Sequence, residues 1–111
     1  MVLAILDDLI FRAKLESSAQ QLGTQVTVAA DPSGAQRPGQ GWSRVLIDLN
    51  LTRGDALATI RALRQTDPDV PIIGYCSHVQ KDLQQQALSA GCTTVLPRSK
   101  FVQQLSELLS S

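Results

Sequence analysis

The sequence predicts an α/β fold of three layers, a doubly wound parallel sheet of five strands with helices on both faces. Short apolar runs alternate with helical patterns at a steady spacing along the 111 residues, which is typical of βα units around a parallel sheet. The first run, Val2–Leu6, contains no polar residue, as expected of a strand that is buried on both faces. Hydrophobic residues make up 43% of the chain and aromatic residues only 4%, so we expect one domain over residues 1–111 with an aliphatic core.

The first half of the chain predicts two strands separated by a helix. Val2–Leu6 is followed by a helix over Leu9–Leu22, which Gly23 can end. Gln25–Ala30 is a shorter, edge-like strand. Asp31–Gly41 contains two prolines and three glycines, so we expect an irregular loop there, and the second helix of the fold is short or missing. The buried face of the first helix is expected to comprise Phe11, Leu15, Ala19 and Leu22.

The second half continues the same alternation. Strands are expected over Arg44–Leu49, from Ile72 onward and over Thr93–Leu96, and helices over Gly54–Gln65 and Val79–Ala90. Ser99 is well placed to cap the last helix. The apolar face of that helix is expected to be Val102, Leu105 and Leu109, with Phe101 nearby.

The charge balance and the cysteine content exclude several classes of protein. Ten Lys and Arg residues balance ten Asp and Glu residues, so no cationic surplus favours nucleic acid or an anionic membrane. Cys76 and Cys92 are too few for a disulfide framework or a zinc site, and nothing obvious would orient the imidazole of His78 for a catalytic pair with Cys76. The apolar start of the chain is too short for a signal sequence or a membrane span, so we expect a complete cytoplasmic protein.

Chemically informative side chains lie at or just after the ends of four predicted strands. In chain order they are Asp7 and Asp8, then Asp48, then Cys76, Ser77 and His78, and finally Arg98. Parallel strands end at one edge of the sheet, so three carboxylates converge there if the first and third strands are neighbours. A hard cation, a raised pKa on one carboxylate or a nearby Arg or Lys relieves the repulsion in such a cluster. A carboxylate held there can also attack a phosphoryl group whose charge a metal neutralises.

The motifs LAILDD, VLIDLNL, VPIIGYCS and AGCTTVLPRSKF, in this order, resemble the bacterial response-regulator receiver domain. The resemblance covers essentially the whole chain and implies a flavodoxin-like sheet in strand order 2-1-3-4-5, which accepts a phosphoryl group from a histidine kinase. It matches Asp48 to the phospho-acceptor, and Asp7 and Asp8 to the acidic pair that holds magnesium. The residue that lends its backbone carbonyl to the metal is matched by Asn50.

The chain departs from the family pattern at the positions that report phosphorylation. The hydroxyl position at the end of the fourth strand falls on Cys76, with Ser77 one residue later, and a thiol is a poor hydrogen-bond donor. The lysine position falls on Arg98, whose planar guanidinium is not equivalent to a compact ammonium. Val95 stands at the usual aromatic position, and Ser99 stands at the proline position after the lysine.

The resemblance implies a stand-alone receiver in a two-component phosphorelay rather than an enzyme. We expect Mg²⁺ as its cofactor, a histidine kinase or phosphotransfer protein as its donor, a downstream protein partner, and a monomer or weak homodimer. Neither nucleic acid nor a membrane is expected as a partner. The main alternative is a pseudo-receiver that acts as an interaction module without phosphorylation. A flavodoxin-like FMN binder is disfavoured, because Asp7 and Asp8 would repel the phosphate of FMN.

Simpler roles of the individual residues stay open. Asp7 and Asp8 can cap the first helix. Asp48 can be a solvated strand-end acid, and Arg98 can merely neutralise the three carboxylates.

Overall fold

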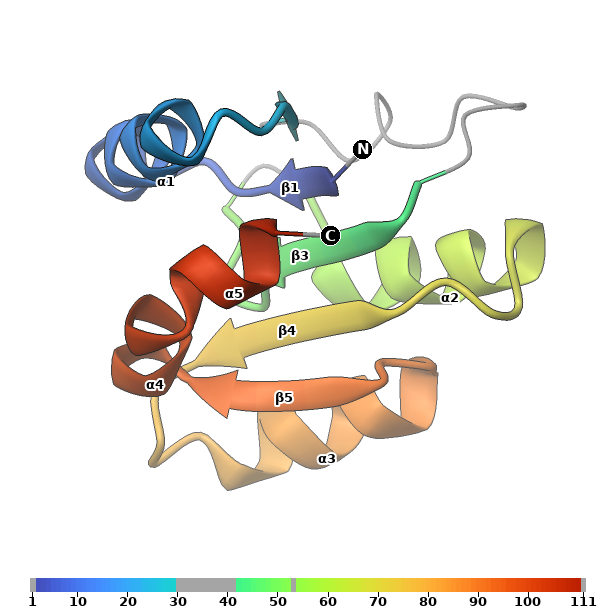
Figure 1. Ribbon diagram of the computed structural model, residues 1–111. Helices are drawn as coiled ribbons and strands as arrows, with labels where there is room; N and C mark the ends of the chain where they lie inside the picture. Colours follow the sequence, from blue (N-terminus) through green and yellow to red (C-terminus); the bar gives the residue numbers. More distant parts are fainter. Residues whose placement is uncertain (1, 30–41, 53, 111) are drawn as a thin grey trace.

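The chain folds into a parallel sheet of five strands (Figure 1). The computed structural model describes residues 2–29, 42–52 and 54–110. Its strands are β1 (Val2–Ile5), β2 (Val26–Ala29), β3 (Arg44–Asp48), β4 (Ile72–Cys76) and β5 (Thr94–Pro97). They pair in the order β2-β1-β3-β4-β5, which confirms the order that the resemblance implies. The irregular loop predicted over Asp31–Gly41, with its short or missing second helix, lies outside the described residues.

Five helices in the described residues cover the two faces of the sheet. They are α1 (Leu9–Leu22), α2 (Ala56–Thr66), α3 (Lys81–Ala90), α4 (Arg98–Gln103) and α5 (Leu105–Leu109). Figure 1 shows α2 and α3 behind the sheet, with α4 and α5 in front of it. In the ranges that the structure describes, no helix is both long enough and apolar enough to cross a membrane.

The sheet separates two hydrophobic cores. Ile5 and Ile47 pack with Ile60 of α2 on one face. Leu46 packs with Phe11 and Phe101, from α1 and α4, on the other. Neighbouring strand residues thus enter opposite cores, because successive side chains of a strand point to opposite faces. Each side chain buried in this way contributes roughly 1.5–3 kcal/mol, and this two-sided burial explains why the first strand contains no polar residue.

The ends of α1 agree with the sequence. The Asp8 side chain accepts hydrogen bonds from the backbone N–H groups of Ile10 and Phe11, at 3.0 and 3.1 Å, and so caps the helix. Gly23 ends it with φ +69°, a left-handed conformation that glycine adopts without strain. Leu22, expected on the buried face, is 42% exposed. The buried face of the helix ends at Ala19, and Leu22 is its last residue.

The last helix differs from the prediction. Ser99 does not cap it, because α4 begins at Arg98, directly after Pro97 at the end of β5. Pro97 has φ −59°, and the fixed φ of proline suits a helix start, so the strand passes into the helix without a linker. The helix is also divided at Gln104 into α4 and α5. Phe101, expected only near the apolar face, is fully buried.

Candidate functional site

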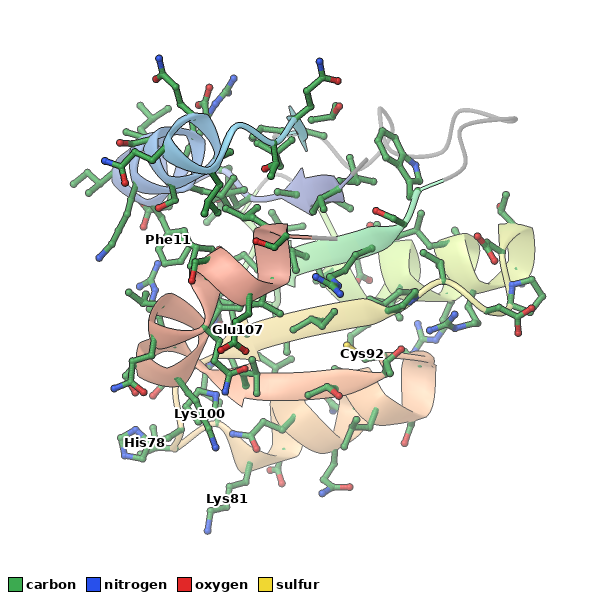
Figure 2. The ribbon with its side chains drawn as sticks, in the orientation of Figure 1. Phe11, His78, Lys81, Cys92, Lys100 and Glu107 are labelled. Carbon is green, nitrogen blue, oxygen red and sulfur yellow. The ribbon has the colours of Figure 1, made fainter. Side chains whose placement is uncertain are left out.

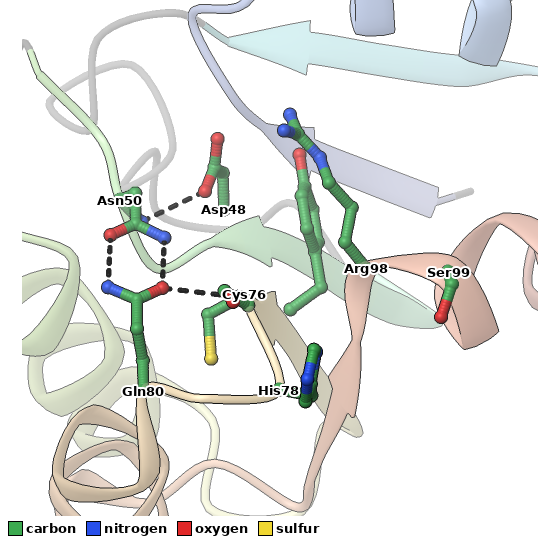
Figure 3. A pocket seen from close by; sticks show the side chains of 9 residues that line it. Asp48, Asn50, Cys76, His78, Gln80, Arg98 and Ser99 are labelled. Carbon is green, nitrogen blue, oxygen red and sulfur yellow. Dashed lines mark hydrogen bonds between the residues drawn. The ribbon is translucent and has the colours of Figure 1, made fainter.

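The carboxyl ends of β3 and β4 and the start of α4 surround a pocket of about 300 Å³ (Figure 3). The residues that line it are Asp48, Asn50, Tyr75, Cys76, Ser77, His78, Gln80, Arg98 and Ser99. The structure therefore brings together five of the predicted site residues, from Asp48 to Arg98. The other two, Asp7 and Asp8, are not among the lining residues and lie between β1 and α1.

Asp48 is the last residue of β3, and it is only 6% exposed. The Asn50 backbone N–H donates to its Oδ1 at 2.9 Å; among the described residues no donor contacts Oδ2. Burial raises the pKa of Asp48, and the nearby charges of Asp7 and Asp8 add to that effect, while the Asn50 N–H and Arg98 oppose it. The simple interpretation of Asp48 as a solvated acid is wrong, because the carboxylate is buried.

Asp8 combines helix capping with an ion pair. Its Oδ1 accepts the two backbone hydrogen bonds of the α1 N-terminus, and Arg98 Nη2 donates to its Oδ2 at 3.1 Å. These contacts, first of all the Phe11 N–H, lower the pKa of Asp8. The guanidinium of Arg98 also lies 5.2 Å from the centre of the Phe11 ring, a cation–π distance. Arg98 therefore neutralises part of the acidic cluster from the start of α4.

The donor type of the acidic residues fits a hard divalent cation. Carboxylate oxygens are the ligands that Mg²⁺ and Ca²⁺ take in proteins. Burial is the first cause of the raised pKa of Asp48, and the charges of Asp7 and Asp8 add a smaller part, which is the part that such a cation would relieve. In the described part of the chain, no three His, Cys, Asp or Glu side chains form a ready-made metal site. The Asp7 Oδ2 instead accepts from the Thr52 hydroxyl and N–H, at 2.7 and 2.9 Å. Asp7 and Asp8 therefore already accept hydrogen bonds from protein donors.

A pair of amides joins the two loops beside the pocket. The side chains of Asn50 and Gln80 donate to each other's oxygen atoms, both at 3.0 Å, and the Ser77 N–H donates to the same Gln80 oxygen at 3.1 Å (Figure 3). This pairing connects the loop that follows Asp48 at the end of β3 to the loop after β4. Sequence reasoning missed Gln80, because nothing in its local pattern shows that a residue 30 positions from Asn50 will face it.

The two residues at the end of β4 enter opposite faces of the sheet. Cys76 is buried in the core of the α2 and α3 face, where burial raises the pKa of its thiol. Tyr75 belongs to the core on the α1 face, and both residues line the pocket. His78 lies exposed on the following loop, with its side chain directed outward (Figure 2). Tyr75 was another residue that sequence reasoning missed, although strand alternation places it opposite in direction to Cys76.

The comparisons with known proteins agree with this geometry. Residues 2–110 match the response regulator receiver domain family. No curated protein matches the chain significantly in sequence. Several solved structures share its fold. One is the receiver domain of a sensor histidine kinase from Pseudomonas aeruginosa PAO1, with a magnesium ion coordinated in its active-site cleft. Its sequence is 24% identical to this chain and its TM-score is 0.79. The match covers 99% of this chain and 97% of that one.

Two further structures carry chemistry in their descriptions. A response regulator from Burkholderia pseudomallei, with a phosphorylated aspartic acid, a calcium ion and citrate, is 21% identical with a TM-score of 0.82, over 99% of this chain and 66% of that one. The receiver domain of Ssk1 from Saccharomyces cerevisiae, in complex with the histidine phosphotransfer protein Ypd1, is 17% identical with a TM-score of 0.80, over 97% and 87%. The family match over nearly the whole length decides the assignment: this chain belongs to the response regulator receiver domain family.

Proposed function

We propose that this receiver domain accepts a phosphoryl group on Asp48 in a two-component phosphorelay. The observation that carries the proposal is the state of the Asp48 carboxylate. It is buried at the pocket wall, one oxygen is held by the Asn50 N–H, and no donor among the described residues contacts the other. A carboxylate fixed in this way presents one oxygen as a nucleophile in a defined direction.

The transfer is an in-line displacement at phosphorus. Asp48 Oδ2 attacks the phosphorus of a phosphohistidine, a P–O bond forms, and the P–N bond breaks with its electron pair returning to the imidazole nitrogen. The product is an acyl phosphate on Asp48. Arg98, already directed to the acidic cluster through Asp8, supplies positive charge for the incoming oxygens, and its planar fork can bind two of them.

Asp7, Asp8 and Asp48, with the backbone carbonyl of Asn50, are the residues that we propose to hold Mg²⁺. The ion would neutralise the charge of the phosphoryl oxygens as they approach three carboxylates. Support comes from the carboxylate donor set and from the related receivers that contain magnesium or calcium. The chain's own contribution is to fix the Asp48 carboxylate through Asn50 and to place Arg98 on the opposite side of the cluster.

The phosphoryl donor that we propose is a histidine kinase or a histidine phosphotransfer protein in the cytoplasm. We propose that the phosphorylated receiver signals by binding a protein partner and that this chain catalyses no further reaction. A related receiver binds a phosphotransfer protein. The pseudo-receiver alternative rests on the substitutions at Cys76, Val95, Arg98 and Ser99. It is less favoured, because Asp48 is both present and held in position.

Phosphorylation should be visible by mass. Incubating the protein with phosphoramidate and MgCl₂ is expected to add one phosphoryl group, detected by intact-protein mass spectrometry and mapped to the peptide that contains Asp48. Omitting MgCl₂ provides the control and should slow the gain, because the carboxylates then repel the donor. An unchanged mass of the wild-type protein under these conditions would contradict the proposal.

Magnesium should also stabilise the unphosphorylated protein. At about ten times its Kd, a ligand that binds only the folded state adds about 1.4 kcal/mol, which for a domain of this size corresponds to roughly 5–10 °C in melting temperature. The measurement is a thermal melt at millimolar MgCl₂, compared with NaCl of the same ionic strength. Identical melting temperatures in the two salts would count against a metal site.

A further inference from the structure

Tyr75 holds a buried hydroxyl that no part of the proposed transfer uses. The residue is 2% exposed, and its hydroxyl has no hydrogen-bond partner among the described residues. Burying a hydroxyl without a partner costs folding free energy, and such groups in native proteins call for a specific explanation. Tyr75 also lines the pocket that contains Asp48, so the residue borders the space that a phosphoryl group on Asp48 would enter.

Strand register places Tyr75 beside Asp48. The two residues are partners across β3 and β4. Leu46 belongs to the same core as Tyr75, whereas Ile47 belongs to the opposite core. Because side chains alternate along a strand, Asp48 points to the same face of the sheet as Tyr75. Cys76, which occupies the family's hydroxyl position, enters the opposite core.

The aromatic ring of Tyr75 is fixed in place. It stacks on Phe101 with ring centres 4.2 Å apart and on Phe11 at 5.1 Å. Its hydroxyl stays protonated at physiological pH, because burial and the charge of Asp48 raise the pKa of Tyr75 well above its usual range. A rigid, protonated donor on the face of Asp48 is a preorganised partner for a developing negative charge.

We infer that the Tyr75 hydroxyl donates a hydrogen bond to an oxygen of the phosphoryl group on Asp48, and so replaces the hydroxyl that Cys76 lacks. This inference rests on the proposed phosphorylation of Asp48. The nearby Ser77 is a weaker candidate, because it is exposed on the loop after β4, whereas Tyr75 is buried beside its strand partner Asp48. A phosphoryl oxygen would give the buried phenol its missing acceptor, and the aromatic stack would then sense phosphorylation.

The test removes only the hydroxyl. Tyr75→Phe keeps the aromatic stack, and its rate of phosphorylation by phosphoramidate and MgCl₂ is expected to fall at least about tenfold, with a melting temperature equal to or above the wild-type value. A purely structural hydroxyl would give the reverse, a lower melting temperature at an unchanged rate. The matched control is Thr24→Val, which removes the other hydroxyl that is buried without a partner in the described ranges and lies outside the pocket. This variant should react at the wild-type rate.

A second measurement needs no variant of Tyr75. Tyr75 is the only tyrosine in the chain, so protein labelled with ¹³C at tyrosine Cζ gives one NMR signal. This signal should shift when the wild type is phosphorylated. It should stay in place when Asp48→Asn is treated identically. Equal rates for Tyr75→Phe and wild type, or a signal that does not move when the wild type is phosphorylated, would overturn this inference alone. A wild-type protein that gains no phosphoryl group would overturn the proposed function and, with it, the inference.

Discussion

Replacing Asp48 with asparagine is expected to abolish phosphorylation completely and to raise the stability of the unphosphorylated protein. The amide has no nucleophilic carboxylate oxygen, so the treatment that phosphorylates the wild type should leave the mass of Asp48→Asn unchanged. The amide oxygen can still accept the Asn50 N–H that now contacts Oδ1, so the local backbone should be retained. The fold no longer buries a charge beside Asp7 and Asp8, whose repulsion contributes to the raised pKa of Asp48.

The stability gain should depend on pH in a defined direction. A carboxylate with a raised pKa binds its proton more tightly in the folded state, so ionised Asp48 lowers the free energy of unfolding at neutral pH. This penalty disappears as the pH falls through the raised pKa towards and below the ordinary value of 3.8. The difference in stability between Asp48→Asn and wild type should therefore be largest at neutral pH and shrink on acidification, as measured by urea unfolding at several pH values.

Asp82→Asn is the matched control for this variant. Asp82 is an exposed carboxylate in the first turn of α3, and the same change there should leave phosphorylation intact and stability within about 0.5 kcal/mol. Phosphorylation of Asp48→Asn at the wild-type rate would show that another residue is the acceptor. A difference in stability that grows on acidification would show that Asp48 is not a buried, repelled carboxylate.

Most of the fold could be predicted because its signals are local. The apolar runs and the helical periodicity identify strands and helices wherever a residue pattern spans one element, as in α1 from Leu9 to its stop at Gly23. The predicted start of the last helix was wrong because two local preferences compete there. The preference of serine for an N-cap favoured Ser99, but the fixed φ of Pro97 lets the helix begin at Arg98.

The candidate site could be predicted only as far as topology determines it. Parallel strands bring Asp48 and the end of β4 to one edge, and the sequence shows which residues lie there. The partner of each side chain depends on contacts between distant segments. Asp8 binds Arg98 across 90 positions, and Asn50 pairs with Gln80 across 30. The direction in which Tyr75 points follows from strand alternation, but its missing hydrogen-bond partner is visible only in three dimensions.

Removing the Phe101 ring should produce the largest loss of stability. Phe101 is 0% exposed. It stacks on Tyr75, and its ring contacts that of Phe11 in a tilted arrangement with ring centres 5.7 Å apart. Phe101→Ala deletes this contact and leaves a cavity, a change that costs about 3–5 kcal/mol in protein cores. Small domains are stable by only about 5–15 kcal/mol, so the urea midpoint should fall sharply and the melting temperature should drop by more than about 12 °C.

Val102→Ala tests whether Phe101 or the rest of its helical turn holds α4 against the sheet. Val102 was predicted on the apolar face, yet it is only partly buried beside the same core, so its truncation should cost less than about half as much as that of Phe101. Equal losses in the two variants would mean that the turn packs as a whole and that the aromatic stack has no special weight. A dominant loss at Phe101 would instead show that its contacts with Tyr75 and Phe11 hold α4 against the sheet. The same ring-to-ring contacts would then support both the stability of α4 and the position of the Tyr75 hydroxyl beside Asp48.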